Sequence, residues 1–104
     1  MAIVNEHSMS FDALSAILTK YGDRVKYIKT ENNTIALNQH FNGIPFVLEN
    51  SDLEKETFDG YEFVKVKSWD SFNRKVYYSL IRMNDIRTIV VADKATDRID
   101  PFRC

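Results

Sequence analysis

The stretch VYYSLIRMNDIRTIVVAD, residues 76–93, contains two apolar runs of the kind found in β-strands. The runs Val76–Ile81 and Ile89–Ala92 are rich in β-branched and aromatic residues. A polar segment, Arg82–Thr88, separates them. This break is either a corner between two strands or a binding motif, and the surrounding sequence favours a corner.

Further strand patterns precede this stretch. RVKYIKT (24–30) and TIALN (34–38) flank a Glu-Asn-Asn turn and predict a hairpin. In NGIPFVLEN (42–50), Pro45 restricts the predicted strand to an edge or a first position. Residues 51–60 are acidic and predict a connection with up to one helical turn. The dipeptide Asp59-Gly60 then opens a strand over 61–69, and a loop at 71–73 returns the chain into 74–82.

One amphipathic helix precedes these strands. Ser10, or Ser8, can cap its first amides, and Gly22 is placed to end it. The apolar side chains recur at helical spacing over residues 10–21 and form one stripe: Phe11, Leu14, Ile17, Leu18 and Tyr21. Such a stripe must cover an apolar surface, and the strands that follow supply one.

These elements predict an α+β fold in a single domain spanning 1–104, with loosely ordered ends at 1–8 and 95–104. About six strands with short connections should be mostly antiparallel. The helix then packs either on an open sheet of five to six strands or on a partly closed SH3/Sm-like β-barrel. A barrel would remove exposed sheet edges.

The composition indicates a soluble globular chain, with 44% hydrophobic and 28% charged residues. The N-terminus MAIVNEHSMSF lacks the basic start of a signal peptide, and no run approaches a membrane span of roughly 18 apolar residues. Cys104 is the single cysteine, which excludes an intrachain disulfide. We therefore expect a cytoplasmic protein.

Residues suited to catalysis or metal binding are sparse. Neither His7 nor His40 belongs to a spaced ligand motif, and three glycines cannot build a phosphate-binding loop. The acidic residues of 49–59 could attract a hard cation or a basic partner, but their spacing fits no EF-hand, so a solvated loop is favoured. We expect no enzymatic activity, no cofactor and no metal site.

The segment LIRMNDIRTI, residues 80–89, resembles the second signature of Sm-like RNA-binding proteins, in which an Arg-Gly-x-Asn-like corner joins the last two strands. The resemblance implies an RNA contact for Arg82 and a polar contact for Asn84 or Asp85. Met83 stands where that family has glycine. Small SH3-like barrels place a one-turn 3₁₀ corner at the same point without any RNA, and we favour this plain corner.

The segment WDSFNRKVYY, residues 69–78, combines aromatic side chains with a polar hairpin tip. Trp, Tyr and Arg are enriched at the energetic centres of protein interfaces. We therefore predict a partner-binding set of Trp69, Phe72, Arg74 and Tyr77. Since Tyr77 and Tyr78 face opposite sides of a strand, one of them should point outward.

Two classes of function follow. The first is a small non-enzymatic protein that binds another protein as an inhibitor, adaptor or assembly subunit; its size and composition are typical of proteins from phages and other mobile elements. The alternative is a nucleic-acid-binding small barrel that uses Lys65, Lys67, Arg82, Asn84 and Arg87. An isoelectric point near 6.1 disfavours this alternative, because phosphate contacts need a basic surface. The sequence also leaves open whether the chain forms a homo-oligomer.

Overall fold

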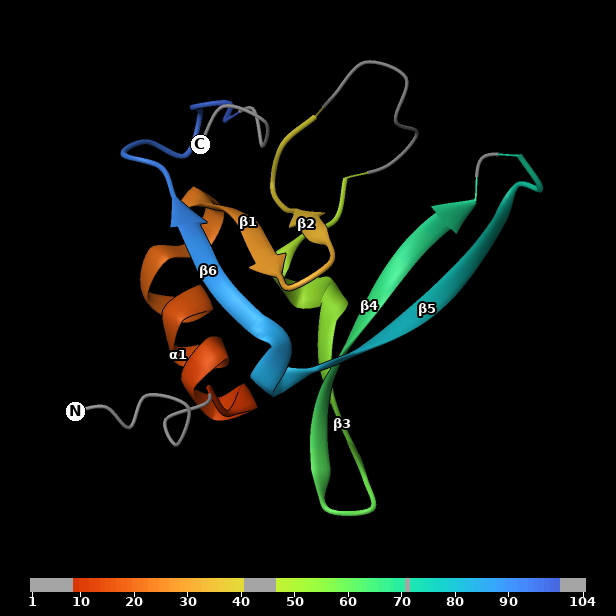
Figure 1. Ribbon diagram of the computed structural model, residues 1–104. Coiled ribbons are helices and arrows are strands. Elements are labelled where there is room, and N and C mark those ends of the chain that lie inside the picture. Colours follow the sequence, from red (N-terminus) through yellow and green to blue (C-terminus); the bar gives the residue numbers. More distant parts are fainter. Residues whose placement is uncertain (1–8, 41–46, 71, 100–104) are drawn as a thin grey trace.

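The described part of the chain folds as one α-helix followed by two antiparallel three-stranded sheets. The computed structural model describes residues 9–40, 47–70 and 72–99, and Figure 1 shows their arrangement. The α+β prediction is confirmed. The strands form open sheets and do not close into a barrel.

Helix α1 spans Phe11–Tyr21 and begins and ends as the sequence predicts. The Ser10 Oγ accepts a hydrogen bond from the Ala13 amide at 3.1 Å, which satisfies one of the free N–H groups of the first turn. At the other end Gly22 has φ of 55°, a left-handed value that glycine adopts without the steric cost of a Cβ. A short 3₁₀ turn, η2 (Gly22–Arg24), then leads into the first sheet.

The first sheet has the strand order β2-β1-β6. Strand β1 (Val25–Thr30) pairs with β2 (Thr34–Ala36) on one side, as predicted, and with β6 (Ile86–Val91) on the other. The chain therefore brings its last strand beside its first. This pairing joins two segments that lie far apart in the sequence.

The second sheet has the order β3-β4-β5 and contains a strand that the sequence did not reveal. Residues 51–60 were expected to be an acidic connection, but after the 3₁₀ turn η3 (Asn50–Asp52) they form β3 (Leu53–Phe58). Strands β4 (Tyr61–Asp70) and β5 (Lys75–Arg82) match the prediction. Of the strand predicted over 42–50, residues 42–46 lie outside the described residues, and 47–49 are not in a strand.

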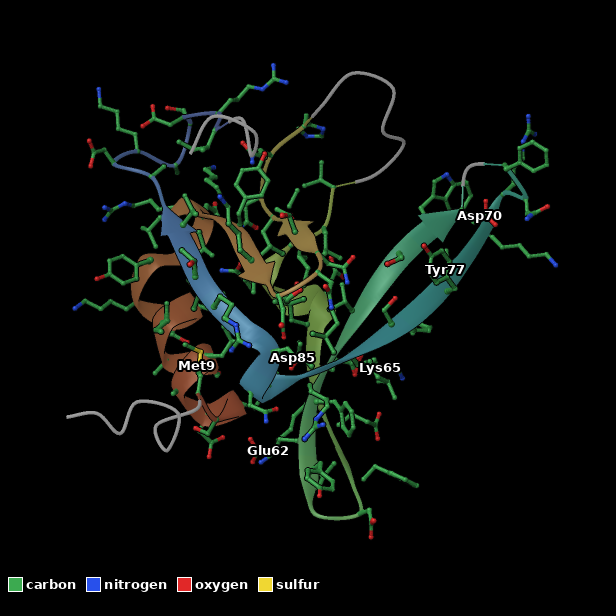
Figure 2. The ribbon with its side chains drawn as sticks, viewed as in Figure 1. Met9, Glu62, Lys65, Asp70, Tyr77 and Asp85 are labelled. Carbon is green, nitrogen blue, oxygen red and sulfur yellow. The ribbon has the colours of Figure 1, made fainter. Side chains whose placement is uncertain are left out.

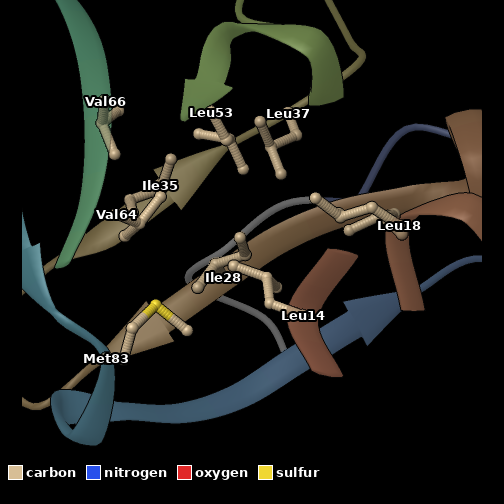
Figure 3. Close-up of a cluster of buried hydrophobic side chains, with 10 residues drawn as sticks. Leu14, Leu18, Ile28, Ile35, Leu37, Leu53, Val64, Val66 and Met83 are labelled. Atoms are coloured by element: carbon tan, nitrogen blue, oxygen red, sulfur yellow. The ribbon is translucent and has the colours of Figure 1, made fainter. Parts of the chain in front are cut away.

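The corner between the last two strands is a 3₁₀ turn, η4 (Met83–Asp85). The sequence predicted a one-turn 3₁₀ corner at this point, and the structure has one. Met83 is buried at 3% exposure and joins the core, so its side chain has a packing function at the position where Sm-like proteins carry glycine. Figure 3 shows Met83 at one end of the buried cluster.

The core lies between α1 and the facing sides of both sheets. Leu14 and Leu18 supply the centre of the helical stripe and are buried, and Phe11 and Tyr21 pack at its border. Ile17 is only half-buried. From the second sheet, Val64 and Val66 of β4 point into the cluster.

The chain after β6 is held by side chains of β1 and its neighbours. The buried Lys26 donates from Nζ to the carbonyl oxygens of Asn38 at 3.1 Å and Ala95 at 2.6 Å. The Tyr27 hydroxyl donates to the Ile99 carbonyl at 2.5 Å. Residues 95–99 are thus hydrogen bonded, whereas 1–8 and 100–104, the other ends expected to be loose, lie outside the described residues.

Candidate functional site

The sheet β3-β4-β5 has one face on the core and one face in solvent. Val64 and Val66 of β4 point into the core, so the odd-numbered residues of β4 point away from it. Directly paired residues of antiparallel strands lie on the same face. The pairing of Lys65 with Leu80 and of Lys67 with Tyr78 therefore assigns Leu80 and Tyr78 to the solvent face.

We call this solvent face the outer face. It consists of Glu54, Glu56, Phe58, Tyr61, Phe63, Lys65, Lys67, Trp69, Val76, Tyr78, Leu80 and Arg82. Five of its large side chains are at least half exposed: Phe58 71%, Tyr61 55%, Val76 50%, Tyr78 52% and Leu80 53%. Exposed apolar groups that share one face mark a contact surface more often than scattered ones do.

Cationic side chains lie among these apolar groups. The Lys65 Nζ is 4.6 Å from the centroid of the Tyr78 ring, and the Arg82 guanidinium is 5.0 Å from the centroid of Tyr61. Both are diagonal neighbours across the β4–β5 ladder, which is within reach of long side chains. The outer face therefore combines aromatic rings with positive charge.

Strands β4 and β5 form a twisted hairpin, residues 61–82, which we call the arm, and the end that carries the Asp70–Lys75 turn projects beyond the core (Figure 1). At its tip the Asp70 carboxylate accepts hydrogen bonds from the amides of Phe72 and Asn73, at 3.0 and 3.2 Å. The Asn73 side chain donates to the same carboxylate at 2.8 Å. These hydrogen bonds stabilise the ionised carboxylate and lower the pKa of Asp70, and the bond from the Asn73 side chain has the largest effect.

The tip presents Phe72 to solvent. Its side chain is 94% exposed, so it contributes almost nothing to the core. Arg74 follows in the left-handed region, with φ of 54°, and is also exposed. A turn fixed by Asp70 thus holds an aromatic and a guanidinium group at the far end of the arm.

The predicted partner-binding residues all lie on the arm, but they do not share one face. Trp69 is on the outer face, opposite Val76. Tyr77 pairs with Ser68 and lies on the other face, at 50% exposure (Figure 2). Tyr78 is the tyrosine on the outer face. The sequence did not indicate which of the two tyrosines points outward, and in the structure both are about half exposed.

The predicted nucleic-acid-binding residues are divided between two places. Lys65, Lys67 and Arg82 are on the outer face. Asn84 lies in the η4 corner, where its carbonyl accepts a hydrogen bond from Arg87 at 3.1 Å. Arg87 also binds Glu31 at 3.2 Å, which occupies its guanidinium in a surface ion pair.

The acidic residues of 49–59 lie at the η3 turn, along β3 and in the turn that follows it. Within 9–40, 47–70 and 72–99, the structure contains no group of three His, Cys, Asp or Glu side chains suited to a metal ion. Asp52 accepts from the Glu49 amide at 2.9 Å and lies 3.9 Å from Lys67, while Glu54 and Glu56 stand along β3. His7 lies outside the described residues.

No helix in the described part of the chain is long and apolar enough to span a membrane. No family model, curated protein or solved structure matches this sequence.

Proposed function

We propose that this chain is a non-enzymatic module that binds another protein through the outer face and tip of its arm. The observation that carries the proposal is the alignment of Phe58, Tyr61, Val76, Tyr78 and Leu80 on one face, each at least half exposed. A domain with a complete core between α1 and its sheets has no structural need for a second apolar face.

The composition of the face supports a protein partner. Aromatic side chains and arginine are enriched in the centres of protein interfaces, where they bury a large area with few rotatable bonds. Tyr61, Tyr78 and Arg82 supply these groups, and Phe72 extends the surface to the tip. A hairpin whose tip projects from a folded body is suited to an inhibitor, adaptor or assembly subunit, because it can enter a cleft of a larger partner.

Binding of single-stranded nucleic acid is the second candidate. The observation that favours it is the placement of Lys65 and Arg82 beside the rings of Tyr78 and Tyr61 on one sheet face. Sheets with exposed rings and nearby cations stack bases and neutralise phosphates. Against it, Glu54 stands directly opposite Lys65, and the chain carries a net charge of −1.

A pull-down from lysate with and without nuclease separates the two candidates. The chain is compared with a variant that combines Tyr78→Ser and Leu80→Ser on the outer face. The matched control is Ala16→Ser, an exposed position on α1. We expect the unmodified chain to capture a protein in the presence of nuclease. The double variant should lose this protein, and the control should retain it. Capture that disappears with nuclease transfers the function to the second candidate.

A further inference from the structure

Strand β5 has one edge that no other described strand pairs with. It pairs with β4 over eight residues, Lys75 to Arg82, and the sheet order β3-β4-β5 leaves its other side unpaired among the described strands. In an antiparallel sheet, alternate residues of an edge strand point their N–H and C=O groups outward. A free edge of this length is a template for another strand.

The other edge of the same sheet offers an internal comparison. Strand β3 is also an edge strand, but three consecutive charged residues, Glu54, Lys55 and Glu56, occupy its centre. Charges of this kind protect natural edges against unwanted strand pairing. The centre of β5 is VYYSLI, without a charge, a proline or a shift in register, and its charges stand only at Lys75 and Arg82. The sheet protects one edge and leaves the other open.

The positive charge of the arm favours an acidic partner at this open edge. The arm carries the cations Lys65, Lys67, Arg74, Lys75 and Arg82 and the acids Glu62 and Asp70, which is five minus two, or +3. Both acids already accept hydrogen bonds, Glu62 from Phe11 and Asp70 from Asn73. Arg74 and Lys75, by contrast, form no ion pair with any residue that the structure describes.

We propose that the edge of β5 binds an extended acidic segment of a partner protein as a fourth strand of the sheet. This inference rests on the proposed function and specifies how the partner is held. Backbone groups of β5 supply the hydrogen bonds, as in other complexes formed by strand addition. Lys75 and Arg82, at the two ends of β5, attract acidic side chains near the ends of the incoming strand.

The two faces of the sheet define the side chains of that segment. On the outer face the incoming strand lies beside Val76, Tyr78 and Leu80, so every second residue is apolar. On the other face it lies beside Tyr77 and Ser79, where small or polar residues fit. The expected ligand is therefore an alternating strand of about seven residues with Asp or Glu near both ends.

A second copy of the chain is a weaker occupant. Pairing of β5 with another β5 places two arms side by side, and each arm carries a charge of +3. Like charges at short distance oppose such pairing, whereas an acidic strand gains from the same field.

The test selects ligands from a displayed library of random decapeptides, with the full chain as bait. The best peptide is then synthesised, and amide hydrogen exchange of the ¹⁵N-labelled chain is measured with and without it. We expect enrichment of alternating apolar peptides with acidic ends. Alternate amides within 76–81 should exchange at least about tenfold more slowly in the complex, because only outward-pointing N–H groups gain a partner.

Two variants locate the contact. Leu80→Glu puts an acid at the centre of the β5 edge and should weaken peptide binding at least about tenfold. Ala16→Glu is the matched control, since it places the same acid at an exposed position of α1, outside the arm and the outer face, and it should change binding less than about twofold. The exchange measurement on the unmodified chain decides the matter if either variant fails to fold.

Each opposite result has a distinct meaning. Weakening by Leu80→Glu without alternating protection would place the partner on the outer face; the edge inference fails, and the proposed function stands. Selected peptides that neither variant weakens would refute both. Alternating protection that appears with rising chain concentration and no peptide, or with a single-stranded oligonucleotide instead of a peptide, would refute the acidic strand.

Discussion

Glu62 of β4 and Phe11 at the start of α1 are joined by a hydrogen bond from the Phe11 amide to the Glu62 Oε1 at 2.8 Å. The two residues are 51 positions apart, so the bond ties the helix to the base of the arm. A carboxylate at this point satisfies a free N–H of the first helical turn and faces the positive end of the helix dipole. The hydrogen bond from Phe11 is the main cause that lowers the pKa of Glu62, and the charge of Lys55 lowers it further.

The first prediction concerns pH. Because the pKa of Glu62 is lower in the folded chain than its ordinary value of 4.5, folding favours the ionised carboxylate. Its stabilising contribution is complete above the ordinary value and is lost as the pH falls through the folded pKa. Glu62→Gln should therefore lower the Tm at pH 7, and the difference from the unmodified chain should shrink towards pH 3.

Thermal unfolding followed by circular dichroism between pH 7 and pH 3 measures this difference. Lys55→Gln is the control, since it removes the 3.6 Å ion pair to Glu62 but keeps the bond to Phe11. It should have the smaller effect, because exposed ion pairs contribute little. A Tm difference for Glu62→Gln that stays constant over this range would show that the ionised carboxylate has no part in holding the helix.

The second prediction concerns the helix stripe. Leu14 is fully buried in the core, so Leu14→Ala should lower the free energy of unfolding by about 2–5 kcal/mol through the cavity it leaves. Ile17 belongs to the same predicted stripe, but its side chain is only half-buried, so Ile17→Ala should lower the free energy of unfolding clearly less. Urea denaturation of both variants tests the order. Equal losses would mean that Ile17 is packed as tightly as Leu14.

The helix and most strands could be predicted because their signals are local. Ser10 and Gly22 set the limits of α1, and the apolar runs of β1, β4 and β5 exceed their neighbours in hydrophobicity. Strand β3 escaped prediction because only Leu53 reaches the core and the next four residues, Glu54 to Thr57, are all polar, so the sequence shows no alternation of apolar and polar positions. Its pairing with β4, not its own composition, makes it a strand.

The faces of the arm could be predicted only in part. Strand alternation separates Tyr77 from Tyr78, but the arm extends beyond the core, so both tyrosines are half exposed and burial does not distinguish them. Only the pairing of Tyr78 with Lys67 and of Tyr77 with Ser68 assigns their faces. The exposure of Phe72 could be predicted, because polar residues of the hairpin tip flank it on both sides.

The third prediction concerns the segment after β6. Lys26 is 1% exposed, and its Nζ donates to the carbonyl oxygens of Asn38 and Ala95. Lys26→Met keeps the aliphatic stem but removes the charged donor from the carbonyl groups of Asn38 and Ala95, which should cost about 1–3 kcal/mol. Amides of 95–99 should exchange faster in the variant. Tyr27→Phe, which removes one bond to Ile99, is the milder companion, at about 1 kcal/mol. Unchanged exchange in Lys26→Met would show that the bonds from Lys26 do not hold the segment.

The last prediction separates folding from binding at the tip of the arm. Phe72 is 94% exposed, so Phe72→Ala should change the free energy of unfolding by no more than about 0.5 kcal/mol. If Phe72 is an interface anchor, the same change should weaken binding to the captured protein partner by about 2 kcal/mol or more, which is the range of interface hot spots. Urea denaturation gives the first quantity, and calorimetric titration of the purified partner gives the second.

Asp70→Ala supplies the control for this measurement. It keeps Phe72 but removes the carboxylate that fixes the turn through the amides of Phe72 and Asn73. A preorganised anchor should bind more weakly when its turn is loosened, since the ordering cost then falls on binding. We therefore expect Asp70→Ala to weaken binding less than Phe72→Ala does, but measurably. Full affinity in both variants would move the contact from the tip to the outer face around Tyr78 and Leu80.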